Sequence, residues 1–226
     1  KELNMENGKN KSLDIFGIKP IADSTKACTQ AAIDGASAFL GRICLPAAEE
    51  FGLLLQDKVK YWRQNNTIKM LQMAEAKLNK SDGDVKKHAH PRLVSNIIQQ
   101  GSWVDEDIVQ GMWAGLLASS CTDEGQDESN LIFVGILRQI TSLQARIINC
   151  CEHAELVISG VGWISVEKIL SVELKILEEI TECSDFHRLD RELDHLRALE
   201  LIHAGFTPDS TDADITPVSL ALQLYV

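Results

Sequence analysis

The sequence predicts a mainly α-helical protein, and two observations support that prediction. Apolar residues recur at intervals of three and four along most of the 226 residues, a spacing that gathers them on one face of a helix. Runs typical of strands are short and lie after residue 154. We therefore expect a multi-helix bundle that carries only a few short strands.

The first part of the chain predicts a lead-in followed by helices. Residues 1–22 are polar and irregular, and we expect them to be poorly ordered. A long alanine-rich helix should begin near residues 23–25, and Pro46 should end or kink it because proline lacks a backbone donor. Further helices are expected over Thr67–Asn79 and from Pro91 onward, since proline suits a first helical turn.

The central helices are the most apolar. Ser102 is expected to cap a helix over Trp103–Ser119, with Asp105 at the third position. That helix is apolar on two faces, which indicates a place in the middle of the bundle. Another helix with little polar surface follows over Leu131–Ile140. The core anchors expected from these two helices are Trp113, Leu116, Leu117 and Phe133.

The last third should begin with a helix capped by Thr141-Ser142, followed by a short strand over Glu155–Ser159. The most regular helical spacing in the chain predicts a helix over Ser165–Cys183, and a second is expected over Asp185–Leu199. A two-stranded hairpin over residues 201–216 and a final helix complete the chain.

This order of helix, helix, hairpin and helix is typical of a winged helix, with the hairpin as the wing. We therefore expect a winged-helix-like C-terminal module with a short β-hairpin over residues 137–226. The N-terminal helical region should span residues 23–136, after the poorly ordered lead-in of residues 1–22.

Charge is distributed unevenly along the chain. The whole sequence holds 22 Lys or Arg and 33 Asp or Glu, a net charge of −11, but residues 1–100 have a balance of +4 and residues 101–226 a balance of −15. A contact with an anionic partner is therefore expected in the first half. The alternative is a solvated helix face that complements the acidic half. The candidate contacts with an anionic partner are Lys58, Lys60, Arg63, Lys86 and Lys87.

The acidic half indicates a protein partner. The helix expected in the recognition position of the winged helix, Asp185 to Glu200, carries five acids against three arginines. Because duplex DNA is densely negative, we do not expect double-stranded DNA to bind through this module. The candidate acidic surface for a protein contact consists of Asp190, Glu192 and Asp194.

Signature motifs of enzymes and metal sites are absent from the sequence, so no catalytic residue, metal ligand or cofactor is expected. His88-Ala-His90 is the pair most like a metal site, but it has no third ligand nearby. The six cysteines form no C-x-x-C pair, and the chain shows no signal peptide and no stretch of about 20 apolar residues. We expect a cytoplasmic protein with free thiols, with an anionic surface at the inner face of the membrane as an alternative location.

Several runs are distinctive as sequences: Pro91-Arg-Leu-Val, Met112-Trp-Ala-Gly-Leu-Leu-Ala118, Phe133-Val-Gly-Ile-Leu-Arg and, near the end, Leu193-Asp-His-Leu-Arg. Together they resemble the Abi-alpha family, a group of bacterial proteins associated with abortive infection. The resemblance implies a role in antiphage defence and supplies no catalytic residues.

On this resemblance, we expect an abortive-infection-type protein that acts non-catalytically through protein–protein interaction. Two alternatives stay open. One is a membrane-perturbing effector that uses the Ala/Gly-rich helices of residues 25–61. The other is an enzyme, such as a nuclease, with a site that sequence motifs do not reveal.

Overall fold

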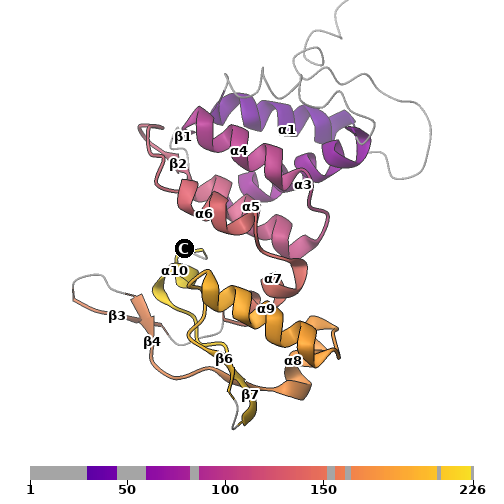
Figure 1. Ribbon diagram of the computed structural model, residues 1–226. Helices are drawn as coiled ribbons and strands as arrows, with labels where there is room; N and C mark the ends of the chain where they lie inside the picture. Colours follow the sequence, from indigo (N-terminus) through magenta and orange to yellow (C-terminus); the bar gives the residue numbers. More distant parts are fainter. Residues whose placement is uncertain are drawn as a thin grey trace, which may run out of the picture. The chain divides into compact units, whose positions relative to one another are not determined.

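The structure, a computed structural model, describes residues 30–44, 60–81, 87–151, 156–160, 164–207 and 210–224. These residues are mostly helical, which confirms the prediction of a mainly α protein (Figure 1). The predicted lead-in of residues 1–22 lies outside the described residues. The chain divides into two compact units: the first unit holds residues 1–105 and 113–134, and the second unit holds residues 106–112 and 135–226.

The first unit is built mainly from helices. Its elements, two of which continue into the second unit, are α1 (Gln30–Ile43), α3 (Lys60–Ser81), β1 (His88–Ala89), α4 (Pro91–Gly101), α5 (Asp107–Ser119), β2 (Cys121–Thr122) and α6 (Leu131–Leu137). The division into units passes through α5 and α6. The two short strands pair antiparallel, with His88 opposite Thr122. Proline begins α4, as its fixed backbone angle favours.

Helix α3 begins at Lys60, ahead of the predicted start at Thr67. Its first turns bury polar side chains, and Asn66 donates from Nδ2 to the backbone oxygen of Ser102 at 3.1 Å. An apolar stripe could not reveal these turns because their inward-facing residues are polar.

The predicted cap at Ser102 is wrong. Helix α4 continues to Gly101, and the Ser102 backbone N–H donates to the oxygen of Ile98 at 3.0 Å, which places Ser102 at the end of α4. The next helix starts at Asp107, and Glu106 Oε2 accepts from the N–H of Val109 at 2.9 Å. Glu106 therefore supplies the N-terminal cap of this helix, in place of Ser102.

The core of the first unit forms where α3, α4 and α5 approach one another. Trp113 is only 1% exposed, Leu116 and Leu117 are also buried, and Phe133 stays partly exposed. A Cβ atom on Gly101 would lie 2.5 Å from Met70 Sδ and 3.3 Å from Trp113 Cγ. Glycine at this position therefore allows the close approach of the three helices.

The second unit contains helices and two small sheets. Its further elements are α7 (Ser142–Cys150), β3 (Leu156–Ile158), β4 (Ile164–Val166), β5 (Ser171–Glu173), α8 (Leu174–Thr181), α9 (Phe186–Ala198), β6 (Gly205–Thr207), β7 (Ser210–Asp214) and α10 (Ser219–Leu222). Strands β3 and β4 form an antiparallel pair, and β7 lies between β5 and β6 in an antiparallel three-stranded sheet.

The helix predicted over Ser165–Cys183 is wrong in its first half. Residues 164–166 pair with β3, residues 171–173 pair with β7, and only Leu174–Thr181 forms helix α8. The apolar spacing fits a helix, but pairing with distant strands determines the conformation, since strand preference depends strongly on tertiary context.

Several local predictions in this unit are confirmed. Thr141 caps α7 through a capping box with Gln144, and Asp185 Oδ1 accepts from the N–H of Arg188 at 3.2 Å at the start of α9. The predicted strand after residue 154 is β3, and the predicted hairpin is β6 and β7, with Phe206 opposite Ala213. The predicted final helix is α10, which begins at Ser219.

Candidate functional site

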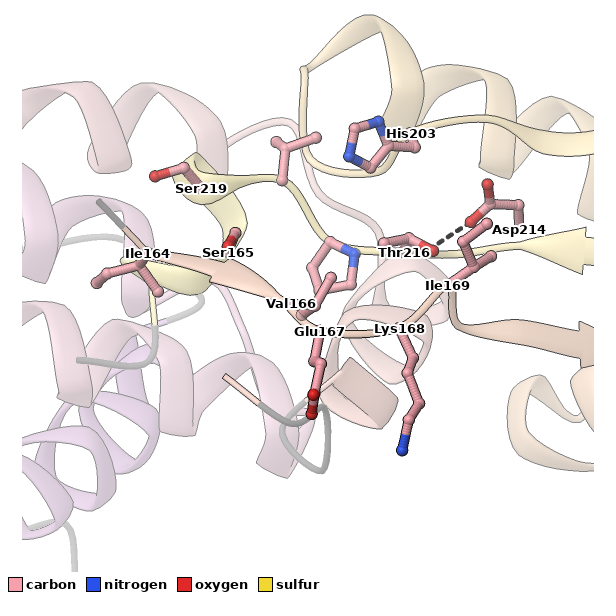
Figure 2. A pocket seen from close by; sticks show the side chains of 12 residues that line it. Ile164, Ser165, Val166, Glu167, Lys168, Ile169, His203, Asp214, Thr216 and Ser219 are labelled. Atoms are coloured by element: carbon pink, nitrogen blue, oxygen red, sulfur yellow. Dashed lines mark hydrogen bonds between the residues drawn. The ribbon is translucent and has the colours of Figure 1, made fainter. Parts of the chain in front are cut away.

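A groove of about 540 Å³ lies in the second unit (Figure 2). One wall is the continuous run of residues 164–169, and the other consists of His203, Asp214 and residues 216–219. Volumes of about 300–1,000 Å³ are typical of ligand pockets. Apolar side chains line the groove from both walls: Ile164, Val166, Ile169, Pro217 and Val218.

Hydrogen bonds join the two walls at one end. The Ile215 N–H donates to the backbone oxygen of Leu170 at 3.0 Å, and the Leu170 N–H donates to Thr216 Oγ1 at 2.8 Å. Thr216 is oriented in turn by Asp214, whose Oδ1 accepts from the Thr216 N–H at 2.9 Å (Figure 2). The bond between Ile215 and Leu170 continues the pairing of β5 with β7 by one residue beyond Ser171, and the side chain of Thr216 adds a second link.

Beyond Leu170 the walls separate. The backbone oxygen of Thr216 accepts from the N–H of His203 at 3.0 Å, and the Val218 N–H donates to the oxygen of Leu201 at 3.1 Å. Ile202 also forms a bridge with Pro217. The backbone of residues 216–218 is therefore paired with residues 201–203, and the groove opens between that backbone and residues 164–169.

The second unit is strongly acidic. Its residues include 17 Asp or Glu and 7 Lys or Arg, so that 7 − 17 gives a net charge of −10. The charged residues that line the groove are two acids, Glu167 and Asp214, and one lysine, Lys168. A partner of this unit gains from positive charge, both in the rate of encounter and in the orientation of binding.

Large apolar side chains of the same unit are exposed. Ile169 at the groove is 76% exposed, and Ile158 on β3 is 68% exposed. Exposed apolar side chains that gather on a surface mark sites of protein interaction. An acidic unit with a groove and exposed apolar residues is therefore suited to bind a cationic, partly apolar partner.

Comparison with known proteins identifies the family. The family model described as abortive infection alpha matches residues 63–219, which include every residue that lines the groove. The chain belongs to the abortive infection alpha family. This confirms the family expected from the sequence, whose name indicates abortive-infection defence. No curated protein and no solved structure matches the chain.

In this abortive infection alpha protein, the three candidate acidic residues do not share one surface. Glu192 is only 9% exposed; its Oε2 accepts from Thr141 Oγ1 at 2.9 Å, and its backbone oxygen accepts from Gln144 Nε2 at 3.2 Å. Asp190 is half-buried, and Asp194 is exposed. The expectation that Glu192 contacts a partner is therefore wrong. The burial of Glu192 could have been predicted from the sequence, because Glu192 follows Leu189 by three residues and so lies on the buried stripe of the same helix.

Two of the five basic candidates, Arg63 and Lys87, have described side chains. Lys58, Lys86 and the side chain of Lys60 lie outside what the structure describes, and Lys87 is half-buried before β1. Arg63 is buried: Nε and Nη2 donate to Ser102 Oγ at 3.1 and 3.0 Å. Its Cζ lies 4.2 Å from the centroid of the exposed Trp103 ring. Arg63 therefore supports the packing of the first unit, and the expectation of a surface contact is wrong for this residue.

The histidine pair has a structural position. His90 caps α4, where Nδ1 accepts from the Arg92 N–H at 3.3 Å, and it lies 3.6 Å from Glu128 Oε1. Within the described ranges, no group of three or more His, Cys, Asp or Glu could hold a metal ion.

The segment of residues 25–61, on which the alternative of a membrane-perturbing effector depends, is described only over residues 30–44 and at the start of α3. Phe39, Leu40 and Ile43 of α1 are buried. Among the helices that the structure describes, none is long and apolar enough to cross a bilayer alone, and α6 with α7 reaches that length only as a bent pair.

Two buried cysteines make stability depend on pH. Burial raises the pKa of the Cys121 thiol to about 11, against a smaller lowering by Lys87 and Arg42, and burial raises the pKa of Cys151 to about 12. The unfolded chain releases these protons near pH 9, before the folded chain does, so the stabilisation is complete below pH 9 and is lost as pH rises further.

For Cys121, we expect a loss of about 2 kcal/mol of unfolding free energy between pH 8 and pH 10.5. The measurement is urea unfolding of the wild type and of Cys121→Ala at both pH values. The contribution of the Cys121 thiol is the amount by which the unfolding free energy falls more in the wild type than in the variant between these pH values. Equal slopes would show that the thiol does not contribute.

Proposed function

We propose that this abortive infection alpha protein acts in antiphage defence by binding a protein partner through its acidic second unit, without catalysing a reaction. The observation that carries the proposal is the combination of a net charge of −10 with an open groove whose lining includes Ile169, an apolar side chain that is 76% exposed. A surface of this kind favours association with a protein of complementary charge.

We also propose that the second unit is a winged helix. Its elements follow the order α7, β3, β4, β5, α8, α9, β6, β7 and α10, and β7 lies between β5 and β6. Apart from the added β3–β4 pair, the order from α7 to β7 supports this proposal. The hairpin of β6 and β7 would be the wing, and α9 would occupy the recognition position. This arrangement supports a binding module as the working part of the chain.

The arginines of α9 support a protein partner over duplex DNA. Arg197 Nη2 lies 2.6 Å from Asp194 Oδ1, and Arg188 Nε lies 4.0 Å from Glu192 Oε1. Two of the three arginines of α9 are thus paired with acids of their own helix. Phosphates would have to compete for these arginines on a unit of the same charge sign as DNA.

The test of this proposal reverses acids that lie away from the groove lining. Cells that express the wild-type chain or the triple variant Glu179→Lys, Asp190→Lys, Asp194→Lys are infected with phage, and plaques are counted. If a protein partner recognises the acidic unit, the variant should lose at least about tenfold of the protection, because reversed charges repel a cationic partner.

The matched control places three charge reversals on the first unit, as Asp123→Lys, Glu124→Lys and Asp127→Lys, all at exposed positions. This control should protect as the wild type does. Full protection by the triple variant, with wild-type thermal stability and expression, would contradict the proposal, as would equal loss in the control.

A further inference from the structure

The groove of the second unit has an apolar lining on both walls. Val166 and Ile169 contribute to it from one wall, and Pro217 and Val218 contribute from the other. Ile169 is 76% exposed, although its side chain is large and apolar. An apolar group of a partner that covered this side chain would remove it from water, which favours binding.

A carboxylate lies at the end of the groove where the two walls join. Asp214 on β7 pairs with Ser171 on β5, and the N–H of the next residue, Ile215, donates to the oxygen of Leu170. Ile169 follows Leu170 along the same wall, so Ile169 and Asp214 lie at the same end of the groove (Figure 2). A partner that binds there meets an apolar side chain and a negative charge together.

The Asp214 carboxylate is already oriented and still has an oxygen available. Its Oδ1 accepts from the Thr216 N–H at 2.9 Å. Its Oδ2 has no hydrogen-bond partner among the described residues, and no lysine or arginine of those residues forms an ion pair with it. Because this carboxylate loses little freedom when it pairs with a cation, it is suited to accept a charge-assisted hydrogen bond from a partner.

The charge of the unit determines which partner is favoured. Glu167 and Lys168 point away from residues 216–219, and the unit as a whole carries a net charge of −10 (Figure 2). A lysine or arginine of the partner is therefore attracted to Asp214. A second copy of this unit would bring the same negative charge and be repelled, which favours a different protein as the partner.

We propose that the groove binds a partner protein through two neighbouring side chains: an apolar one that packs between the walls against Ile169, and a lysine or arginine that donates to Asp214. The inference deepens the proposed function, on which it rests, by naming the site and the class of partner. Because a few central residues provide most of the binding energy of an interface, loss of either contact should weaken binding strongly.

The experiment selects peptides from a random twelve-residue phage-displayed library on the immobilised full chain. We expect the enriched sequences to share an apolar residue with a lysine or arginine next to it or one residue away. A synthetic copy of an enriched peptide is then titrated against the wild type and against single variants, with fluorescence anisotropy as the measurement.

Asp214→Asn removes the charge and keeps the oxygen that accepts from the Thr216 N–H. Binding should weaken at least about tenfold, because a hydrogen bond between charged groups is lost. Each basic residue of the peptide is also replaced in turn by glutamine. One of these changes should weaken binding to the wild type by a similar factor and binding to Asp214→Asn by less than about twofold, which identifies the residue that Asp214 binds.

Matched variants isolate the two contacts. Asp212→Asn makes the same change two residues earlier on β7, on the same face of the strand but outside the groove lining, and should bind within about twofold of the wild type. Ile169→Ala should weaken binding at least about fivefold, because it removes most of the exposed apolar surface of this side chain. Ile176→Ala, at a 46% exposed position of α8 outside the groove lining, should bind as the wild type does.

The inference is overturned if the library yields no enriched peptide, if the enriched peptides lack a basic residue, or if Asp214→Asn and Asp212→Asn bind equally well. It is likewise overturned if sedimentation shows that the chain pairs with itself and that Ile169→Ala abolishes this pairing. Loss of defence in the triple acid variant without peptide enrichment would leave the proposed function standing and remove only the groove. Peptide binding with full defence in that variant would do the reverse.

Discussion

Replacement of Trp113 by alanine should lower the free energy of unfolding by about 3–5 kcal/mol. The side chain is 1% exposed and lies where α4 comes closest to α5, since a Cβ on Gly101 would be only 3.3 Å from its Cγ. Truncation removes the contacts of the whole indole and leaves a cavity that the surrounding helices can fill only in part. The Trp113 Nε1 donor has no hydrogen-bond partner among the described residues, and a buried donor without a partner destabilises the folded state. Removing this donor therefore offsets a small part of the lost packing energy.

The measurement is urea unfolding of the full chain, followed by circular dichroism. Ile132→Ala is the matched control, since Ile132 belongs to the same unit and is 63% exposed; it should change the unfolding free energy by less than about 0.5 kcal/mol. A loss below about 2 kcal/mol in Trp113→Ala would show that this side chain is not the centre of the first unit's core.

Gln144→Leu should cost about 3 kcal/mol, although leucine is close to glutamine in size and more apolar. The buried side chain joins α7 to α9: Oε1 accepts from the Thr141 N–H at 3.1 Å, and Nε2 donates to the Glu192 backbone oxygen at 3.2 Å. Its Nε2 also lies 2.8 Å from His195 Nδ1. Leucine can make none of these bonds, so polar groups would stay buried without partners.

Thermal unfolding compares Gln144→Leu with Asp194→Ala. Asp194 forms an exposed ion pair with Arg197, so its removal should change stability by less than about 1 kcal/mol. If the two variants lose equal stability, the network of Thr141, Gln144 and Glu192 does not hold the two helices together.

The candidate site was predictable only in part. Net charge by region could be read directly, and it correctly separates an acidic C-terminal part from the rest. The groove could not be predicted, because it exists only where residues 164–169 and 216–218, about 50 positions apart, separate after pairing at Leu170. The burial of Arg63 could not be predicted for the same reason, because its hydrogen-bond partner Ser102 lies 39 residues away in the sequence.

Contacts between residues within one helical turn were enough to predict most of the helices, the cap at Thr141 and the proline start of α4, and the uneven distribution of charge needed only the composition. Only folding makes residues 164–166 and 171–173 strands, buries Glu192 and Arg63, and opens a groove between residues 164–169 and 216–219. The physical reason is the range of the interactions. Caps and amphipathic stripes connect residues three or four positions apart, whereas strand pairing and the burial of polar groups depend on partners brought together only by folding.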